Sequence, residues 1–227
     1  MNNKVKYAMK MTDKFRLNLD DLNEEITLDI IDEILMSESL LDSEELKFSE
    51  LVSYVTGIRT IYITILAYSD LEWTKETDIP LIITIVNIDN AVTNNKINEK
   101  EAWNQIKDLI KRASELTKCY KKEPMLDIYN LREIVTINVI KTFQNLDIKL
   151  INGAGEVSKL CAFSKFIEGI IDAYDNVLYS LDLELSEETE MPLINTINDV
   201  ADAWFEERLT GKDAWNQIKD LIERVSS

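Results

Sequence analysis

Apolar residues recur at intervals of three and four along much of the chain, which is the spacing of one face of an α-helix. One such stripe predicts a first helix and consists of Leu19, Leu22, Ile26, Ile30 and Ile34. A second stripe predicts the next helix and consists of Leu51, Val55, Ile58, Tyr62 and Leu66. Each of these helices is therefore expected to bury one face against the rest of the protein.

The sequence AWNQIKDLI occurs twice, at Ala102–Ile110 and at Ala214–Ile222, and we call the separation between the two copies the nonamer offset. The same offset relates much of the remaining chain without a gap, which indicates a tandem duplication. Pairs that it superimposes include Asn18-Leu19 with Asn130-Leu131, Gly57 with Gly169, and Pro80-Leu81-Ile82 with Pro192-Leu193-Ile194. We therefore expect an all-α protein made of two similar bundles of about four helices each, in residues 1–116 and 117–227.

The segment Ile79–Ile88 is rich in β-branched residues and by itself could form a buried strand. Its counterpart in the second half has apolar residues at helical spacing, and a proline stands at the start of both segments. We therefore predict a helix in both halves. Gly57 and Gly169 fall inside the second predicted helix of each half, where glycine costs about 1 kcal/mol relative to alanine. Their presence in both halves predicts a close approach of two helices there.

In the repeated nonamer, Trp103, Ile106, Leu109 and Ile110 are expected to face the core. The residues that should point outward or sideways are nevertheless repeated as well, and they include Asn104, Lys107 and Asp108. This identity fits a recent duplication, or a terminal helix docked in the same way in each bundle. It also fits a helix face that makes the same contact twice, with the other half or with two copies of a partner.

The chain has a net charge of −17 and contains no histidine. The lack of histidine excludes serine–histidine and cysteine–histidine nucleophiles and histidine-bound zinc. A strongly acidic surface repels nucleic acid and anionic membranes and attracts basic partners. We therefore expect no cofactor, no bound metal, no direct nucleic-acid binding and no membrane partner. The two cysteines, Cys119 and Cys161, do not make a disulfide scaffold, and Cys161 is predicted to be a small core residue.

The negative charge is concentrated in two segments. Between Leu17 and Leu46 every charged residue is acidic, whereas Met1–Arg16 forms a short basic arm. The candidate partner-binding residues of the first acidic segment are Asp20, Asp21, Glu24, Glu25, Asp29, Asp32 and Glu33. Those of the second segment are Glu184, Glu187, Glu188 and Glu190. Both segments could be docking surfaces for a basic protein or simply solvated, solubilising faces.

Trp73 follows Asp70-Leu71-Glu72 at the end of a predicted helix, and Tyr68 lies shortly before it in the chain. Trp73 is either a cap of the apolar core or, together with Tyr68, an exposed aromatic anchor for a partner protein.

Carboxylate-bound Mg²⁺ or Ca²⁺ is the metal chemistry that the composition leaves open. Asp29-x-x-Asp32-Glu33 and Asp42-x-Glu44-Glu45 resemble loosely the paired E-x-x-E and E-x-x-D helices of nucleotide pyrophosphatases. At the nonamer offset the second half has Lys141, Gln144 and Asn145 in place of the first three carboxylates. A metal-dependent hydrolase is therefore the third alternative for the function.

No stretch resembles a signal peptide or a run of about 18 apolar residues that could span a membrane. The first hypothesis is a non-enzymatic, cytoplasmic acidic protein that binds and inhibits or regulates a basic, nucleic-acid-binding protein. Immunity proteins, antitoxins and phage anti-defence proteins are of this type. The second hypothesis is a duplicated helical scaffold or adaptor that joins two partners, and self-association into a homodimer stays open.

Overall fold

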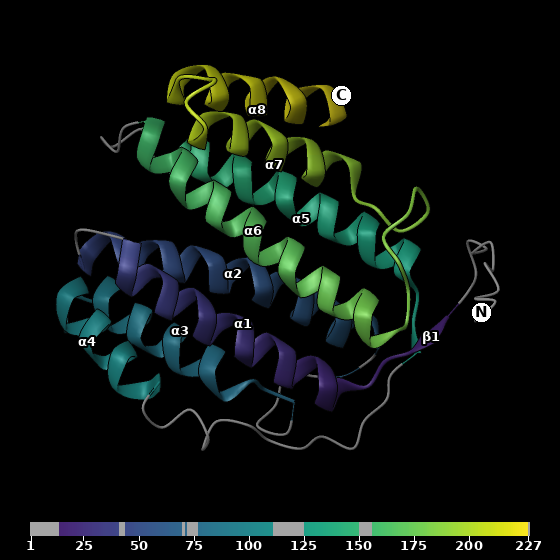
Figure 1. Cartoon of the computed structure of the whole chain (residues 1–227), viewed down its shortest axis with the longest axis horizontal. Coiled ribbons are helices and arrows are strands. Elements are labelled where there is room, and N and C mark those ends of the chain that lie inside the picture. Colours follow the sequence, from purple (N-terminus) through teal and green to yellow (C-terminus); the bar gives the residue numbers. More distant parts are fainter. Residues whose placement is uncertain are drawn as a thin grey trace.

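The computed structural model describes residues 14–40, 44–69, 71, 77–110, 125–149 and 156–226. Within these ranges the chain forms eight helices and one pair of very short strands, so the all-α fold is confirmed. The first half contains α1 (Leu19–Leu40), α2 (Glu44–Tyr68), α3 (Pro80–Thr93) and α4 (Glu99–Ile110). The second half contains α5 (Ile128–Lys149), α6 (Glu156–Ser180), α7 (Pro192–Phe205) and α8 (Gly211–Ser226). Figure 1 shows α1–α4 on one side of the molecule and α5–α8 on the other.

Corresponding helices of the two halves have equal lengths, except for α4 and α8. The segment Ile79–Ile88, which could also have formed a strand, and its counterpart in the second half are both helical. Pro80 and Pro192 are the first residues of α3 and α7. The preceding residues are held in the same way: the Tyr62 hydroxyl donates to the carbonyl of Thr77 at 2.8 Å, and that of Tyr174 to the carbonyl of Thr189 at 2.6 Å. We call these two hydrogen bonds the tyrosine ties, and they hold the chain in place just before each proline.

The starts of the last helices are also alike. Asn98 and Glu101 form a reciprocal cap at the start of α4, with backbone-to-side-chain hydrogen bonds of 3.1 and 2.8 Å. At the start of α8 the side chain of Thr210 accepts a hydrogen bond from the Asp213 amide at 3.1 Å and donates to the Asp213 carboxylate at 2.7 Å. The first residues of α4 and α8 are related by the nonamer offset.

The first helices do not follow the nonamer offset. The buried positions of α1 match those of α5 at an offset three residues shorter than the nonamer offset, so that Leu19 corresponds to Ile128 and Leu22 to Leu131. The gap-free pairing of Asn18-Leu19 with Asn130-Leu131 is therefore wrong in this region. The offset changes because the connection between α5 and α6 is three residues longer than the connection between α1 and α2.

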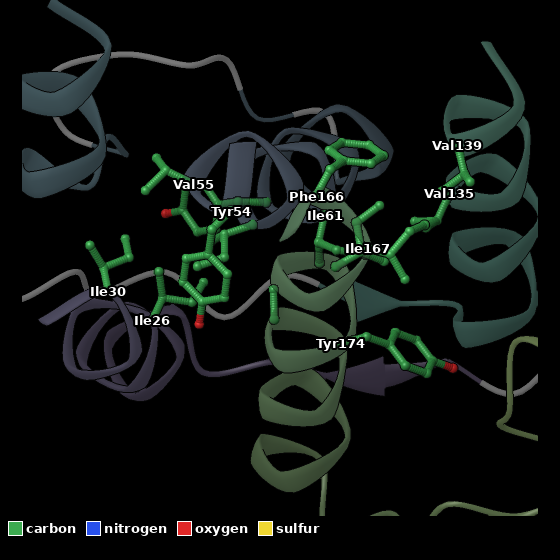
Figure 2. Close-up of a cluster of buried hydrophobic side chains, with 14 of the residues drawn as sticks. Ile26, Ile30, Tyr54, Val55, Ile61, Val135, Val139, Phe166, Ile167 and Tyr174 are labelled. Carbon is green, nitrogen blue, oxygen red and sulfur yellow. The ribbon is translucent and has the colours of Figure 1, made fainter. Parts of the chain in front are cut away.

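The core is one continuous cluster to which both halves contribute. Its centre is the contact of α2 with α6, and α1 packs against α6 as α5 packs against α2. Figure 2 shows α6 between Ile26 and Ile30 of α1 on one side and Val135 and Val139 of α5 on the other. The predicted stripes of the first two helices are confirmed as buried, as are the equivalent residues of α6: Phe163, Ile167, Ile170, Tyr174 and Leu178.

The predicted close approach at the two glycines is confirmed. A Cβ atom on Gly57 would overlap the carbonyl oxygen of Phe166, and one on Gly169 would overlap that of Tyr54. The nonamer offset relates Phe166 to Tyr54, so the two contacts are equivalent. The halves therefore meet through the same surface on each side, as in a two-fold symmetric interface.

A short antiparallel pairing joins the two halves at one end of the molecule. Strand β1 (Phe15–Arg16) pairs with β2 (Met125–Leu126), with Phe15 opposite Leu126. The predicted boundary between residues 116 and 117 lies outside the described residues, as does most of the basic N-terminal arm.

One helix, α2, is long and apolar enough over Lys47–Tyr68 to cross a membrane by length and composition. In the structure this helix is the central one of the first half, and 56% of its apolar stretch is buried inside the protein. Burial in a protein core therefore accounts for its hydropathy.

Candidate functional site

The acidic residues on one flank of α1 lie against α6. The Asn176 side chain donates to the carboxylate of Asp29 at 2.6 Å, and the Lys165 ammonium lies 3.0 Å from a carboxylate oxygen of Glu33. We call this contact the acidic seam. It comprises Glu25, Asp29, Asp32 and Glu33 of α1 and Lys165, Glu168, Asp172 and Asp175 of α6.

Lys165 is the one basic residue of the acidic seam. Its ammonium contacts Glu33 and also lies 2.9 Å from Glu168. The carboxylate of Glu33 is almost fully buried and accepts a further hydrogen bond from the Ser37 hydroxyl at 3.2 Å. Burial alone would lower the pKa of Lys165, but the carboxylates of Glu168 and Glu33 outweigh burial and raise this pKa. Lys165 therefore stays charged at neutral pH.

A third carboxylate, that of Glu50 from α2, lies close enough to this cluster to interact with its charges. Glu50 is only 9% exposed, and in the described part of the chain its carboxylate has neither a hydrogen bond nor an ion pair. Burial raises the pKa of the Glu50 carboxyl, Lys165 opposes this, and the charges of Glu33 and Glu168 add to the increase. The cluster thus holds three carboxyl groups around a single ammonium.

Further along the seam, the buried Tyr54 of α2 donates its hydroxyl hydrogen to Asp172 at 2.7 Å. Burial raises the pKa of Asp172 in spite of this hydrogen bond, and the neighbouring Glu168 and Asp175 raise it further. The pKa of Asp29 is raised first by burial, against the hydrogen bond from Asn176, and then by Asp172 and other carboxylates. Keeping these carboxylates ionised and close to one another along the seam is therefore unfavourable in free energy.

The equivalent contact on the other side of the molecule is built in the same way but is almost uncharged. There Asn138 of α5 lies 3.5 Å from the hydroxyl of Thr64 on α2, at the positions that match Asp29 and Asn176. We call this contact the neutral seam. It comprises Thr56, Thr60, Ile63 and Ala67 of α2 and Ile134, Ile137, Asn138 and Lys141 of α5.

The remaining predicted residues of α1 lie elsewhere on this helix. Asp20 and Asp21 are in its first turn, where acidic residues are favourable for the helix dipole, and the Asp20 amide is capped by Asn18 at 3.0 Å. Glu24 is exposed. Asp20 and Asp21 therefore have a role in starting the helix, in addition to any role in binding.

The second predicted acidic segment lies in the connection between α6 and α7. Its residues Glu184, Glu187 and Glu188 are exposed and Glu190 is half-buried. The connection is attached to α5, because the Arg132 guanidinium donates to the carbonyl oxygen of Glu188. This segment is thus separate in the chain from the acidic seam, and the contact that attaches it to α5 is made by its backbone and not by its carboxylates.

Of the two predicted aromatic anchors, Trp73 lies outside the described residues. Tyr68 is half-buried, and its hydroxyl accepts a hydrogen bond from the Asn130 side chain at 2.8 Å. Tyr68 therefore makes an internal contact between α2 and α5.

The repeated nonamer buries its tryptophan and its first isoleucine in both halves. Trp103 and Ile106 are buried in α4, as are Trp215 and Ile218 in α8, whereas Leu109 and Ile110 are only partly buried. Asn104 and Asp108 are exposed, and the Lys107 ammonium lies 3.8 Å from Glu38 of α1. Figure 1 shows α4 and α8 at opposite sides of the molecule, so the repeated outward face is presented twice.

Several residues in the acidic seam or beside it were not among the site residues predicted from the sequence. Lys165, Glu168 and Asp172 lie on α6, and Glu50 and Tyr54 lie on α2. The i, i+3/i+4 spacing of Cys161, Lys165, Glu168, Asp172 and Asp175 was the available signal for a polar stripe on α6. Cys161 belongs to this stripe and is only half-buried, so its prediction as a core residue is wrong.

Among the described residues, no three Asp, Glu or Cys side chains come together in a way that could hold a metal ion. Asp42 and the side chains of Glu44 and Glu45 lie outside the described part of the chain. Comparisons with protein-family models, with curated proteins and with solved structures find no match. The function is therefore inferred from the geometry and charge of the two seams.

Proposed function

We propose that the chain is a non-enzymatic acidic protein of the cytoplasm that binds a basic protein and thereby inhibits or regulates it. The acidic seam is the proposed docking surface. A basic protein that normally holds nucleic acid carries the complementary charge, so occupation of its basic surface would block that binding. Immunity proteins, antitoxins and phage anti-defence proteins act in this way.

The observation that carries this proposal is the difference between the two seams. Both are formed by the first helix of one half and the second helix of the other, so the fold itself makes no demand for charge there. The neutral seam packs with threonine, asparagine and isoleucine at the positions where the acidic seam has Asp172, Asp29 and Asp175. The acidic seam keeps its carboxylates close together although their repulsion and burial are unfavourable. The positive charges of a bound partner would neutralise part of this negative charge and so reduce the repulsion between the carboxylates.

We further propose that the chain arose by tandem duplication of a four-helix unit, with the units in residues 1–116 and 117–227. The equal helix lengths, the two tyrosine ties and the reciprocal glycine contacts support this proposal. The two seams are then copies of one ancestral contact, of which one has become acidic.

A scaffold that joins two partners is the second candidate. It is favoured by the nonamer, whose exposed Asn104 and Asp108 have identical counterparts in Asn216 and Asp220 on the opposite side of the molecule. A carboxylate-metal hydrolase has less support, because Asp29 and Glu33 are engaged by Asn176 and Lys165.

The proposed function is tested with a fluorescent arginine- and lysine-rich peptide, whose binding is followed by anisotropy at low and high salt. The triple variant Glu25→Gln, Asp32→Asn, Asp175→Asn removes three charges from the acidic seam without touching its buried contacts. The matched variant Glu184→Gln, Glu187→Gln, Glu190→Gln removes three charges from the connection between α6 and α7. We expect binding that weakens strongly by about 0.5 M salt and that only the first variant reduces.

Equal binding by both variants and by the unmodified protein would overturn the acidic seam as the docking surface. A reduction confined to the second variant would move the docking surface to the connection between α6 and α7. Affinity capture from a lysate at low and high salt, read by mass spectrometry, then identifies the natural partner. Recovery of a non-basic partner at both salt concentrations would favour the scaffold.

A further inference from the structure

The outer surface of α1 carries apolar side chains next to the carboxylates of the acidic seam. Leu28 is 49% exposed, Leu35 is 50% exposed and Met36 is 55% exposed. Leu35 and Met36 stand two helical turns after Leu28, so all three lie along one side of the helix. On the facing stripe of α6, Tyr179 is 77% exposed.

This combination differs from an ordinary solvated helix face. A solubilising face mixes acidic with basic residues, whereas α1 has no basic residue in its last turn and none among the residues of its outer surface. Apolar side chains bordered by charges of one sign are typical of a protein-binding surface, in which the apolar contacts supply affinity and the charges supply orientation.

The spacing of the apolar residues defines the shape of what can cover them. Leu28 and Met36 are separated along the axis by about 12 Å, since each residue of a helix rises about 1.5 Å. A second helix laid along α1 would meet them with residues at positions i, i+3 or i+4, and i+7. Its flanking positions would face Glu25, Asp29 and Asp32 on one side, so they must be basic.

The far end of the acidic seam offers a place for a cation. Glu50 is 9% exposed, its carboxylate makes no hydrogen bond or ion pair in the described part of the chain, and it lies close enough to Lys165 for that charge to act on its pKa. The last turn of α1, the negative end of its dipole, contains no basic residue of its own, and Lys47 of α2 donates to the Glu38 carbonyl there at 3.1 Å. Glu33, Glu50 and Glu168 outnumber the single Lys165 between them, so an excess of negative charge is left at this end for a lysine or arginine side chain of a bound helix.

We infer that the acidic seam binds a basic amphipathic helix of the partner protein, with the apolar side of that helix on Leu28, Leu35 and Met36. The inference rests on the proposed function and specifies the kind of element that is bound. A basic arm without regular structure would use the carboxylates alone, whereas an amphipathic helix uses the carboxylates and the apolar residues together.

Two labelled peptides of identical composition, each with lysine and leucine only, distinguish these cases. In one the leucines recur at helical spacing, and in the other the same residues are permuted so that no apolar face forms. We expect the amphipathic peptide to bind the unmodified protein more tightly than the permuted one. The variant Leu28→Gln, Leu35→Gln, Met36→Gln should weaken the amphipathic peptide by roughly 10- to 100-fold and leave the permuted peptide unchanged.

The neutral seam supplies the matched control, because Ile63→Gln, Ile134→Gln, Ile137→Gln changes three exposed apolar residues at the other side of the fold. This variant should bind the amphipathic peptide as the unmodified protein does, and circular dichroism checks that both variants are folded. Equal binding of the two peptides, or a loss that is the same in both variants, would overturn the helix inference and leave the proposed function intact. Failure of both peptides to bind would overturn the proposed function as well.

Discussion

Gly57 of α2 and Gly169 of α6 occupy equivalent positions, and each lies where the backbone of the opposite helix passes. The nearest atoms to an added Cβ are backbone atoms on both sides, including the amide nitrogen of Ile170 at 2.9 Å from a Cβ on Gly57. Backbone atoms cannot move aside as the end of a flexible side chain can. The two central helices are therefore held at a distance that only glycine permits.

Replacement of either glycine by alanine is expected to destabilise the protein by about 3 kcal/mol or more, as overpacking does. Helix propensity alone would have the opposite effect, since alanine is favoured over glycine by about 1 kcal/mol inside a helix. Urea unfolding of Gly57→Ala and Gly169→Ala measures the sign directly. Variants as stable as the unmodified protein, or more stable, would show that the helices do not approach this closely.

Removal of the Lys165 ammonium leaves the buried Glu33 and the partly exposed Glu168 without their cation. Lys165→Met is therefore expected to lower the free energy of unfolding by about 3 kcal/mol at neutral pH, because an unpaired buried charge is costly. Lys141→Met, on the neutral seam, is the matched control and should change stability by less than about 0.5 kcal/mol. Similar small losses in both variants would contradict the central position of Lys165 in the acidic seam.

The carboxyl groups of the acidic seam predict a dependence of stability on pH. Burial raises the pKa of Glu50, Asp29, Asp172 and Glu168 in the folded protein. A group with a raised folded pKa contributes stability below its unfolded pKa and loses that contribution as the pH rises through the folded pKa. The protein should thus melt at a higher temperature near about pH 5 than near about pH 7.5.

Calorimetry across this range measures the effect, and Glu50→Gln tests its origin. Because glutamine does not titrate, this variant should gain stability at neutral pH and show a smaller difference between the two conditions. A melting temperature of the unmodified protein that rises steadily from the acidic to the neutral condition would contradict the prediction.

The tyrosine ties at Tyr62 and Tyr174 predict a pair of equal effects. Each hydroxyl donates to a carbonyl oxygen just before the proline that starts the next helix. Tyr62→Phe and Tyr174→Phe should each reduce the free energy of unfolding by about 1–2 kcal/mol, the usual result of leaving a buried acceptor unsatisfied. Chemical denaturation of both variants provides the comparison, and a large effect in one half alone would indicate that the two ties are not equivalent.

The helices and their buried faces could be predicted because they depend on local spacing. Leu19, Ile26 and Ile34 are buried where the helical period places them. The segment Ile79–Ile88 could be predicted as a helix because its counterpart, which starts at Pro192, has clear helical spacing. The glycine contact was also predictable, since only a packing reason explains glycine inside both helices.

The composition of the acidic seam could be predicted only in part, since it depends on contacts between distant segments. Asp29 and Glu33 were identified as acidic candidates, but their partners Asn176 and Lys165 stand in the other half of the chain. The shift between the first helices was also not visible, because matched identities elsewhere favour the nonamer offset. Local pattern carries no information about which helix of one half packs against which helix of the other.

The reciprocal contact of α2 and α6 has a consequence for how the two seams can change. In a symmetric dimer of identical chains, every substitution appears on both sides at once, so a charge gained by one surface is gained by its twin. Here each surface is encoded separately within one chain, so a substitution at Asp172 changes the acidic seam and leaves the matching Thr60 of the neutral seam unchanged. One surface can therefore change in sequence while its counterpart keeps the packing that holds the two halves together.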